Sequence, residues 1–270
     1  MFAAAIIVLR ETFEAALLIG IIAAATRGIR GRGRWIGAGI AAGAVGAVIV
    51  AALAGRIAAM FEGVGQELFN ATVLGVAVVM LGWHNIWMST HGAELAASAK
   101  RLGREVVEGR RELSAVFVVV ALAVLREGSE TALFLYGLLS GSSQSVLSAS
   151  VGGAGGLLAG TAIGMLLYQG MLKIPVRHFF TVTSGLILFL AAGLAARMAG
   201  FLAQADLIPS LKDPLWDSSS MLSVTSPVGA FMHVLVGYEA TPSGMQVIFY
   251  AVTAAVILVG MLSVRRAHER

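Results

Sequence analysis

The stretch VLRETFEAAL at residues 8–17 places an arginine and two glutamates inside an otherwise apolar segment, and VLREGSETAL at residues 124–133 repeats this arrangement. Seven of the ten positions are identical, and Arg10 of the first copy matches Arg126 of the second at an offset of 116 residues. Each such charge costs roughly 2.5–3.5 kcal/mol to place at the middle of a bilayer. Chance recurrence of three charges in two apolar segments is therefore implausible, and the repeat predicts a functional site built from two copies of one unit.

The composition around these stretches is that of a membrane protein. Of the 270 residues, 58% are hydrophobic and 13% are charged, and the mean hydropathy is +0.86, whereas a soluble domain carries about a quarter charged residues. The chain contains no cysteine, which excludes a disulfide framework, a thiolate metal site and a cysteine nucleophile. A soluble domain is therefore excluded, and the sequence predicts an all-α, multi-pass membrane protein.

Seven segments are long and apolar enough to form membrane-spanning helices, each of which needs about 20 mostly apolar residues. The longest connections between them are a charged segment at 89–113, which has the pattern of a solvated helix, and a segment at 205–244, which holds four of the five prolines and predicts a structured loop. The chain, residues 1–270, is expected to form a single membrane domain. The predicted spans are residues 2–26, 35–60, 68–88, 114–139, 149–172, 179–203 and 245–264.

The basic residues predict the orientation of these spans. Fourteen of the 19 Lys and Arg residues fall on every second connection, and positively charged connections remain in the cytoplasm. We therefore expect the N-terminus outside, the loop at 205–244 outside and the C-terminus in the cytoplasm. The fourteen residues are Arg27, Arg30, Arg32, Arg34, Lys100, Arg101, Arg104, Arg110, Arg111, Lys173, Arg177, Arg265, Arg266 and Arg270.

Weaker similarities extend the repeat over three spans in each half. Glycine and alanine positions of the second span recur in the fifth at an offset of 113 residues, and the third span matches the sixth weakly at 111. Three spans per unit place the two units, residues 1–90 and 114–204, in opposite orientations. Such inverted repeats are typical of transporters, whose site lies near the membrane midplane where the halves meet. The seventh span has no counterpart, and the glycine stripes predict close helix packing.

The charged motifs have a chemistry of their own. Glu11 and Glu14 share one helix face because they are three residues apart, and Arg10 can pair with Glu14 one turn away. The second copy repeats this geometry with Arg126, Glu127 and Glu130 in the equivalent roles. Four carboxylates and two charge-balancing guanidiniums leave a formal charge of −2, which suits a hard cation such as ferric iron. A purely structural salt-bridge network and a proton relay are the alternatives.

The two Arg-Glu-x-x-Glu motifs, in the first and fourth of seven spans, resemble those of the oxidase-dependent iron permease family of fungi and bacteria. Further similar stretches are GRWIG at 33–37, QELF at 66–69, AAGLAA at 191–196 and Trp216-Asp217 in the outer loop. The resemblance implies a high-affinity iron permease of the cytoplasmic (inner) membrane rather than an enzyme. It assigns iron binding and translocation to Glu11, Glu14, Glu127 and Glu130.

The resemblance also implies the partners of the protein. Iron, expected in the ferric form, would be the transported substrate, and no cofactor is expected to be permanently bound. An extracytoplasmic ferroxidase or iron-binding delivery protein would supply the iron. The basic connections would face the lipid bilayer, so no nucleic-acid partner is needed.

The sequence departs from the family at several positions. Thr12-Phe13 and Gly128-Ser129 fill the motifs where the usual first motif has Gly-Leu, and Asn70 stands where many members have a glutamate. Glu67 is therefore the acidic residue expected at the outer end of the third span.

Three residues are candidates for a secondary pathway, namely Glu67, His84 and Asp217. His84 could line the site or be a hydrogen-bonded interior histidine, and His91 is expected at the cytoplasmic interface. His233 and Glu239 belong to a set of outer-loop residues that could collect cations.

Two other functions stay open from the sequence alone. The same scaffold could carry Mn(II), Pb(II) or protons. An intramembrane carboxylate-metal enzyme is the other alternative, although such centres use Glu-x-x-His and neither motif has a histidine at that spacing.

Overall fold

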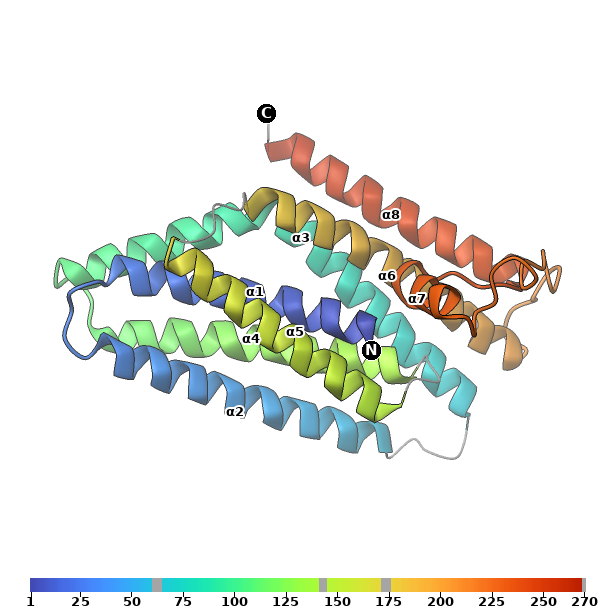
Figure 1. Ribbon diagram of the computed structural model, residues 1–270, viewed down its shortest axis with the longest axis horizontal. Helices are drawn as coiled ribbons and strands as arrows, with labels where there is room; N and C mark the ends of the chain where they lie inside the picture. The colour runs from blue at the N-terminus through green and yellow to red at the C-terminus, as the bar shows by residue number, and fades with distance from the viewer. Residues whose placement is uncertain (60–64, 141–144, 171–175, 269–270) are drawn as a thin grey trace.

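The computed structural model describes residues 1–59, 65–140, 145–170 and 176–268, and within these ranges the chain forms helices and no strands. The elongated helices run roughly side by side (Figure 1). The helices are α1 (Phe2–Ala25), α2 (Arg32–Ala59), α3 (Gln66–Val107), α4 (Leu113–Ser140), α5 (Val146–Tyr168), α6 (Val176–Gln204), α7 (Pro227–Val236) and α8 (Gly244–His268).

Five helices of the described chain are long and apolar enough to cross a membrane. The candidate spans are Arg32–Arg56 of α2, Gln66–Met88 of α3, Val146–Tyr168 of α5, Phe180–Gln204 of α6 and Gly244–Val264 of α8. These ranges agree with five of the seven predicted spans. The other two predicted spans coincide with α1 and α4, which have 24 and 28 residues. Both carry the three charges of a motif, so their composition alone does not mark them as spans.

Two elements differ from the sequence prediction. The third predicted span and much of the 89–113 connection form one continuous helix, α3, of 42 residues, about 63 Å long at 1.5 Å per residue. This is about twice the hydrocarbon thickness of a bilayer. The loop predicted at 205–244 contains the ten-residue helix α7. The Ser226 side chain caps it by accepting a hydrogen bond from the Gly229 amide at 3.0 Å, and Pro227 follows at its first position.

The helices pack in pairs that bring the two halves of the chain together. α1 packs along α5, α2 along α4 and α3 along α6, while α8 lies against α6 and α3. The glycine stripes form the tightest of these contacts. A Cβ atom at Gly43 would lie 2.5 Å from the Ala121 carbonyl oxygen, and one at Gly156 would lie 2.4 Å from the Ala5 carbonyl oxygen. The expectation that the glycines serve close packing is therefore confirmed.

The outer surface of the bundle is apolar, whereas its centre holds charge. Val48, Val79, Leu158 and Val259 are among many large apolar side chains that are more than half exposed. Arg10, by contrast, is fully buried. Such extensive exposed apolar surface marks contact with lipid or another protein.

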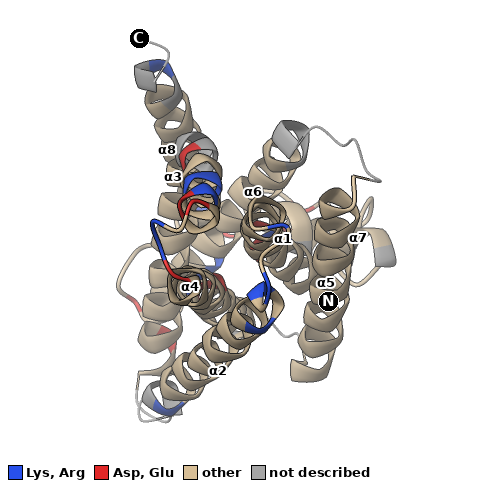
Figure 2. Cartoon of the chain, turned by 90° about the vertical axis from the view of Figure 1, so that its left-hand side faces the viewer, with Lys and Arg blue, Asp and Glu red and all other residues tan. Residues whose placement is uncertain are grey.

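One end of the bundle is basic and has a small core of its own. Figure 2 shows Lys and Arg residues around the turns that join α1 to α2 and α3 to α4. The extended end of α3 packs there through Ala99, Leu102 and Val106 against Ile22 of α1 and Val116 of α4. The end of α3 thus packs against both the last turns of α1 and the first turns of α4.

The glycine contacts predict a sharp difference between two adjacent positions. Gly156→Ala should lower the melting temperature of the purified protein by roughly 2–10 °C, because overpacking costs about 1–3 kcal/mol. A Cβ atom at Gly155 would have no neighbouring atom within 4 Å, so Gly155→Ala is the matched control and should leave the melting temperature unchanged or higher. Equal melting temperatures for the two variants would contradict this packing.

Candidate metal site

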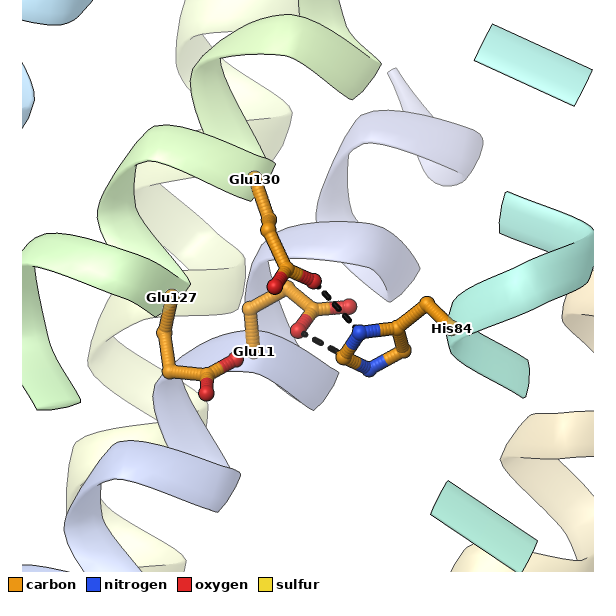
Figure 3. A group of neighbouring side chains, drawn as sticks. All are labelled: Glu11, His84, Glu127 and Glu130. Atoms are coloured by element: carbon orange, nitrogen blue, oxygen red, sulfur yellow. Dashed lines mark ion pairs between the residues drawn. The ribbon is translucent and has the colours of Figure 1, made fainter. Parts of the chain in front are cut away.

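The two charged motifs face one another across the bundle. Glu11 projects from α1, Glu127 and Glu130 project from α4, and His84 of α3 points at them from a third side (Figure 3). One ligand atom from each of these four residues lies within 4.8 Å of the others. Of the six motif residues predicted from sequence, three thus meet in one cluster around a histidine. We call Glu11, His84, Glu127 and Glu130 the carboxylate cluster.

Glu14 borders this cluster through the same histidine. Its Oε2 atom lies 3.6 Å from His84 Nε2, and Glu11 Oε2 lies 3.7 Å from the same nitrogen. The other ring nitrogen, Nδ1, is paired with Glu130 Oε2. The imidazole therefore contacts carboxylates of both sequence repeats, so the site-lining alternative for His84 agrees with the geometry.

The position of His84 is fixed by its neighbours. Asn85, the next residue, is buried and donates a hydrogen bond to the Ser184 carbonyl oxygen of α6 at 3.0 Å. The ring of Phe134 on α4 meets the imidazole edge-on, with ring centroids 6.4 Å apart. A lone histidine inside an apolar span was the available signal in the sequence. The sequence could not predict how far α3 is shifted along α1 and α4, and this shift places His84 beside both motifs.

The two arginines are held in different environments. Arg10 is fully buried, with Nη1 3.1 Å from Glu11 Oε1 and Nη2 3.2 Å from Glu14 Oε1. Arg126 keeps 39% of its side chain exposed, and its Nε lies 3.0 Å from Glu130 Oε1. The predicted pairings one helical turn apart are present in both motifs, but the first motif is enclosed and the second is more open.

A tryptophan that the sequence reasoning missed accompanies the open arginine. The Arg126 guanidinium lies over the ring of Trp87, 4.6 Å from its centroid, where the face of the ring attracts a cation. Trp87 follows His84 by three residues and so shares its helix face. That spacing was the only signal in the sequence for this contact.

Several buried polar atoms of the site lack a hydrogen-bond partner among the described residues. They include Glu11 Oε2, Glu127 Oε2 and His84 Nε2. Burial of an unsatisfied polar group costs about 1–3 kcal/mol, so atoms left in this state at one place indicate a ligand-binding function. Carboxylate oxygens and an imidazole nitrogen are together a donor set for iron and similar transition metals.

The carboxylate cluster adjoins two cavities. Glu11 and Glu127 line a cavity of about 680 Å³ between α1, α2, α4 and α5, whose other walls are mostly apolar. Glu14 and Glu127 line a second cavity of about 40 Å³, which continues past Leu18 and Ala96.

The remaining predicted residues lie outside this cluster. Glu67 is exposed in the first turn of α3, and Asp217 is exposed in the segment between α6 and α7. Asp217 Oδ1 accepts hydrogen bonds from the Ser219 hydroxyl at 2.5 Å and the Ser219 amide at 2.9 Å. These bonds lower the pKa of Asp217 below its ordinary value. The structure does not bring Glu67 or Asp217 to the other candidates, and the side chain of His91 lies outside the described residues.

Comparison with known proteins identifies the scaffold that carries this site. The model of the iron permease FTR1 family matches residues 1–268. The chain belongs to the iron permease family. The resemblance inferred from the two motifs is thereby confirmed, and members of this family are transporters rather than enzymes.

Bacterial relatives of this iron permease agree with the family assignment. The ferrous iron permease EfeU of Yersinia pestis is 32% identical over 255 residues, which cover 93% of this chain and 89% of the relative. EfeU of Escherichia coli O6:K15:H31 is 32% identical over 276 residues, covering 99% and 97%. EfeU of Shigella sonnei is 33% identical over 256 residues, covering 92% and 90%. No solved structure matches the chain.

Proposed function

We propose that this multi-pass membrane protein moves iron across the cytoplasmic membrane through the carboxylate cluster and Glu14. The observation that carries the proposal is the meeting of glutamates from both motifs at one imidazole, with ligand atoms of Glu11, His84, Glu127 and Glu130 within 4.8 Å of one another. Membership of the iron permease family supports iron as the substrate. Arg10 and Arg126 balance part of the negative charge when no cation is bound.

The charge of the site favours ferrous iron as the ion that occupies it. With the imidazole neutral, four carboxylates and two guanidiniums sum to −2, so Fe(II) gives a neutral site and Fe(III) leaves a surplus of +1. The nitrogen of His84 adds a donor that suits Fe(II) better than an all-oxygen set. The relatives named as ferrous iron permeases are consistent with this. The ferric form expected from the sequence is the second candidate.

The ferric candidate has its own support. Carboxylate oxygens are hard donors that suit a trivalent cation, and the partly exposed Arg126 could move away from Glu130 to lessen the surplus charge. In that case an extracytoplasmic oxidase or delivery protein would supply Fe(III). Glu67 and Asp217 would then serve as acidic groups on the path from the outer face.

We propose an inverted-repeat architecture of seven spans, with α1 to α3 and α4 to α6 as the two units and α8 as the seventh span. The glycine contacts support it, because corresponding glycines of α2 and α5 meet corresponding residues of α4 and α1. Gly43 meets Ala121 and Leu125, and Gly156 meets Ala5 and Leu9. Both pairs of partners differ by the 116 residues that separate the two motifs. Because the close pairs α1 with α5 and α2 with α4 each join the two units, movement of these pairs relative to one another would expose the carboxylate cluster to each side in turn.

Iron uptake by cells tests the proposed site. Glu11→Gln, Glu127→Gln and His84→Gln should each lower the uptake of radioactive iron at least tenfold. The first two replace a charged carboxylate by a neutral amide, and the third removes the imidazole nitrogen. Glu94→Gln is the matched control, since it makes the same change at an exposed residue of α3 to which no role in iron binding is assigned, and it should keep most of the uptake. Protein levels in the membrane are measured alongside.

Two further uptake measurements, with iron in each oxidation state and with other metals, identify the transported ion. Uptake supported by ascorbate, which keeps iron ferrous, is expected to exceed uptake from a ferric chelate in vesicles that contain the permease alone. Preference for Mn(II) or Pb(II) over iron would support the other-cation alternative. Unchanged iron uptake in all three cluster variants would refute the assignment of the site.

The absence of cysteine from the chain makes a topology test direct. Ser219→Cys, in the loop between α6 and α7, should react with a membrane-impermeant maleimide added to intact spheroplasts. Arg110→Cys, between α3 and α4, should react only after the membrane is opened. The reverse pattern would contradict the orientation with the N-terminus outside, and labelling of both sites in intact cells would contradict the number of spans.

A further inference from the structure

A second polar pocket lies far along the chain from the two motifs, where α6, α7, α8 and the loop before α7 meet. Its volume is about 300 Å³, at the lower end of the range for small-molecule pockets of about 300–1,000 Å³. Arg197, His233 and Glu239 line it together with Trp216 and Tyr250. None of these residues takes part in the carboxylate cluster.

The histidine of this pocket is fixed in one protonation form by its partners. The Arg197 guanidinium can only donate, and its Nη2 atom lies 2.8 Å from His233 Nε2. His233 Nε2 is therefore the acceptor, and Nδ1 carries the proton that it donates to the Tyr238 carbonyl oxygen at 2.7 Å. Burial and the charge of Arg197 lower the pKa of His233 below its ordinary value. The imidazole is thus neutral and holds the guanidinium in place.

Hydrogen bonds within the protein hold the walls of the pocket in place. The Tyr250 hydroxyl donates to the Val236 carbonyl oxygen at 2.7 Å, and the Tyr238 hydroxyl donates to the Leu222 carbonyl oxygen at 2.8 Å. Gly237 ends α7 with φ of 68°, and a Cβ atom there would lie 2.5 Å from the Cα atom of Gly193 on α6. Because the aromatic walls and the backbone are already fixed, a ligand would lose little affinity to ordering of the pocket.

The charges of the pocket define the ligand that it can hold. Its lining carries one guanidinium, from Arg197, and one carboxylate, from Glu239, whose Oε2 lies 3.5 Å from His233 Nδ1. A free iron cation would be repelled by Arg197, and a multiply charged anionic chelate would be repelled by Glu239. The sequence expectation that His233 and Glu239 collect cations therefore fits this arrangement poorly.

We propose that this pocket binds a zwitterionic group of the phosphoethanolamine type. The phosphate would meet Arg197, which suits oxyanions with its planar set of donors, and the ammonium would meet Glu239 and the faces of the aromatic walls. Arg197 lies seven residues before the end of α6 and Tyr250 six residues after the start of α8. At these depths, about 10 Å from the helix ends, a lipid headgroup or a free zwitterion could reach the pocket. The inference stands independently of the proposed iron site.

A fluorescence titration tests the pocket, because Trp216 is one of only four tryptophans in the chain. Glycerophosphoethanolamine added to the purified full-length permease should give a saturable change in tryptophan emission that is lost in Trp216→Phe. Arg197→Gln and Glu239→Gln should each weaken this binding at least tenfold. Arg56→Gln and Asp206→Asn, which alter exposed residues outside the pocket, are the matched controls and should bind as the wild type does.

Probes that carry only the phosphate or only the ammonium test whether both charges are needed, and phosphatidylethanolamine tests whether the ligand is a lipid. Glycerol phosphate and ethanolamine should each bind at least tenfold more weakly than glycerophosphoethanolamine, and equal binding of either would overturn the proposal. Wild-type binding by folded Arg197→Gln protein, judged by its melting temperature, would also overturn it. Should Arg197→Gln not fold, Glu239→Gln makes the same decision. Native mass spectrometry counts the phosphatidylethanolamine molecules that stay bound to the purified protein. If the wild type retains this lipid and the variants lose it, the ligand is a lipid headgroup. If only the free probe binds, the ligand is a soluble zwitterion.

Discussion

In the middle of the bundle, His84 lies between glutamates of both sequence repeats, and the arginine of each repeat pairs with the glutamate one turn away. Six ionisable motif residues cannot leave water separately, because each costs roughly 2.5–3.5 kcal/mol at the membrane centre. They are tolerable only when they offset one another. That requirement sets α1 against α4 and places α3 beside both, so the packing of the bundle and the composition of the site have one cause.

The glycine contacts make this meeting of charges possible. α1 can bring its motif close to α4 because each of them is flanked by a glycine-lined helix, α5 for α1 and α2 for α4, at nearly backbone contact. The two flanking contacts use equivalent residues in the two halves of the chain. The site itself departs from this equivalence, since Arg10 is buried, Arg126 is 39% exposed, and a single histidine serves both motifs. A cation at the centre would therefore contact two sequence repeats whose helices pack in the same way. The motif of the first repeat is closed to solvent, and the motif of the second is partly open to it.

Much of this arrangement could be predicted from the sequence, because its signals are local. Hydrophobic length marked the helices, and the spacing of Arg10 and Glu14 predicted their ion pair. The glycine periodicity predicted the close contacts. The central place of His84 and the contact of Trp87 with Arg126 could not be predicted in the same way, since both depend on the register of α3 against helices distant in sequence. The length of α3 and the existence of α7 were missed for a different reason. The charged segment at 89–113 was predicted to be a separate solvated helix, whereas its packing against α1 and α4 makes most of it part of α3. The proline-containing segment was predicted to be a loop, whereas the cap at Ser226 favours a helix there.

We propose that one iron ion lies between the two halves of the permease, with both carboxylate and imidazole ligands. Anomalous scattering at the iron absorption edge, from crystals grown with ferrous iron under reducing conditions, measures this directly. We predict a single strong peak within bonding distance of Glu11, His84 and at least one of Glu127 and Glu130, which disappears in His84→Gln. Iron bound only at acidic residues between α6 and α7, such as Asp217, with no peak between α1 and α4, would contradict it.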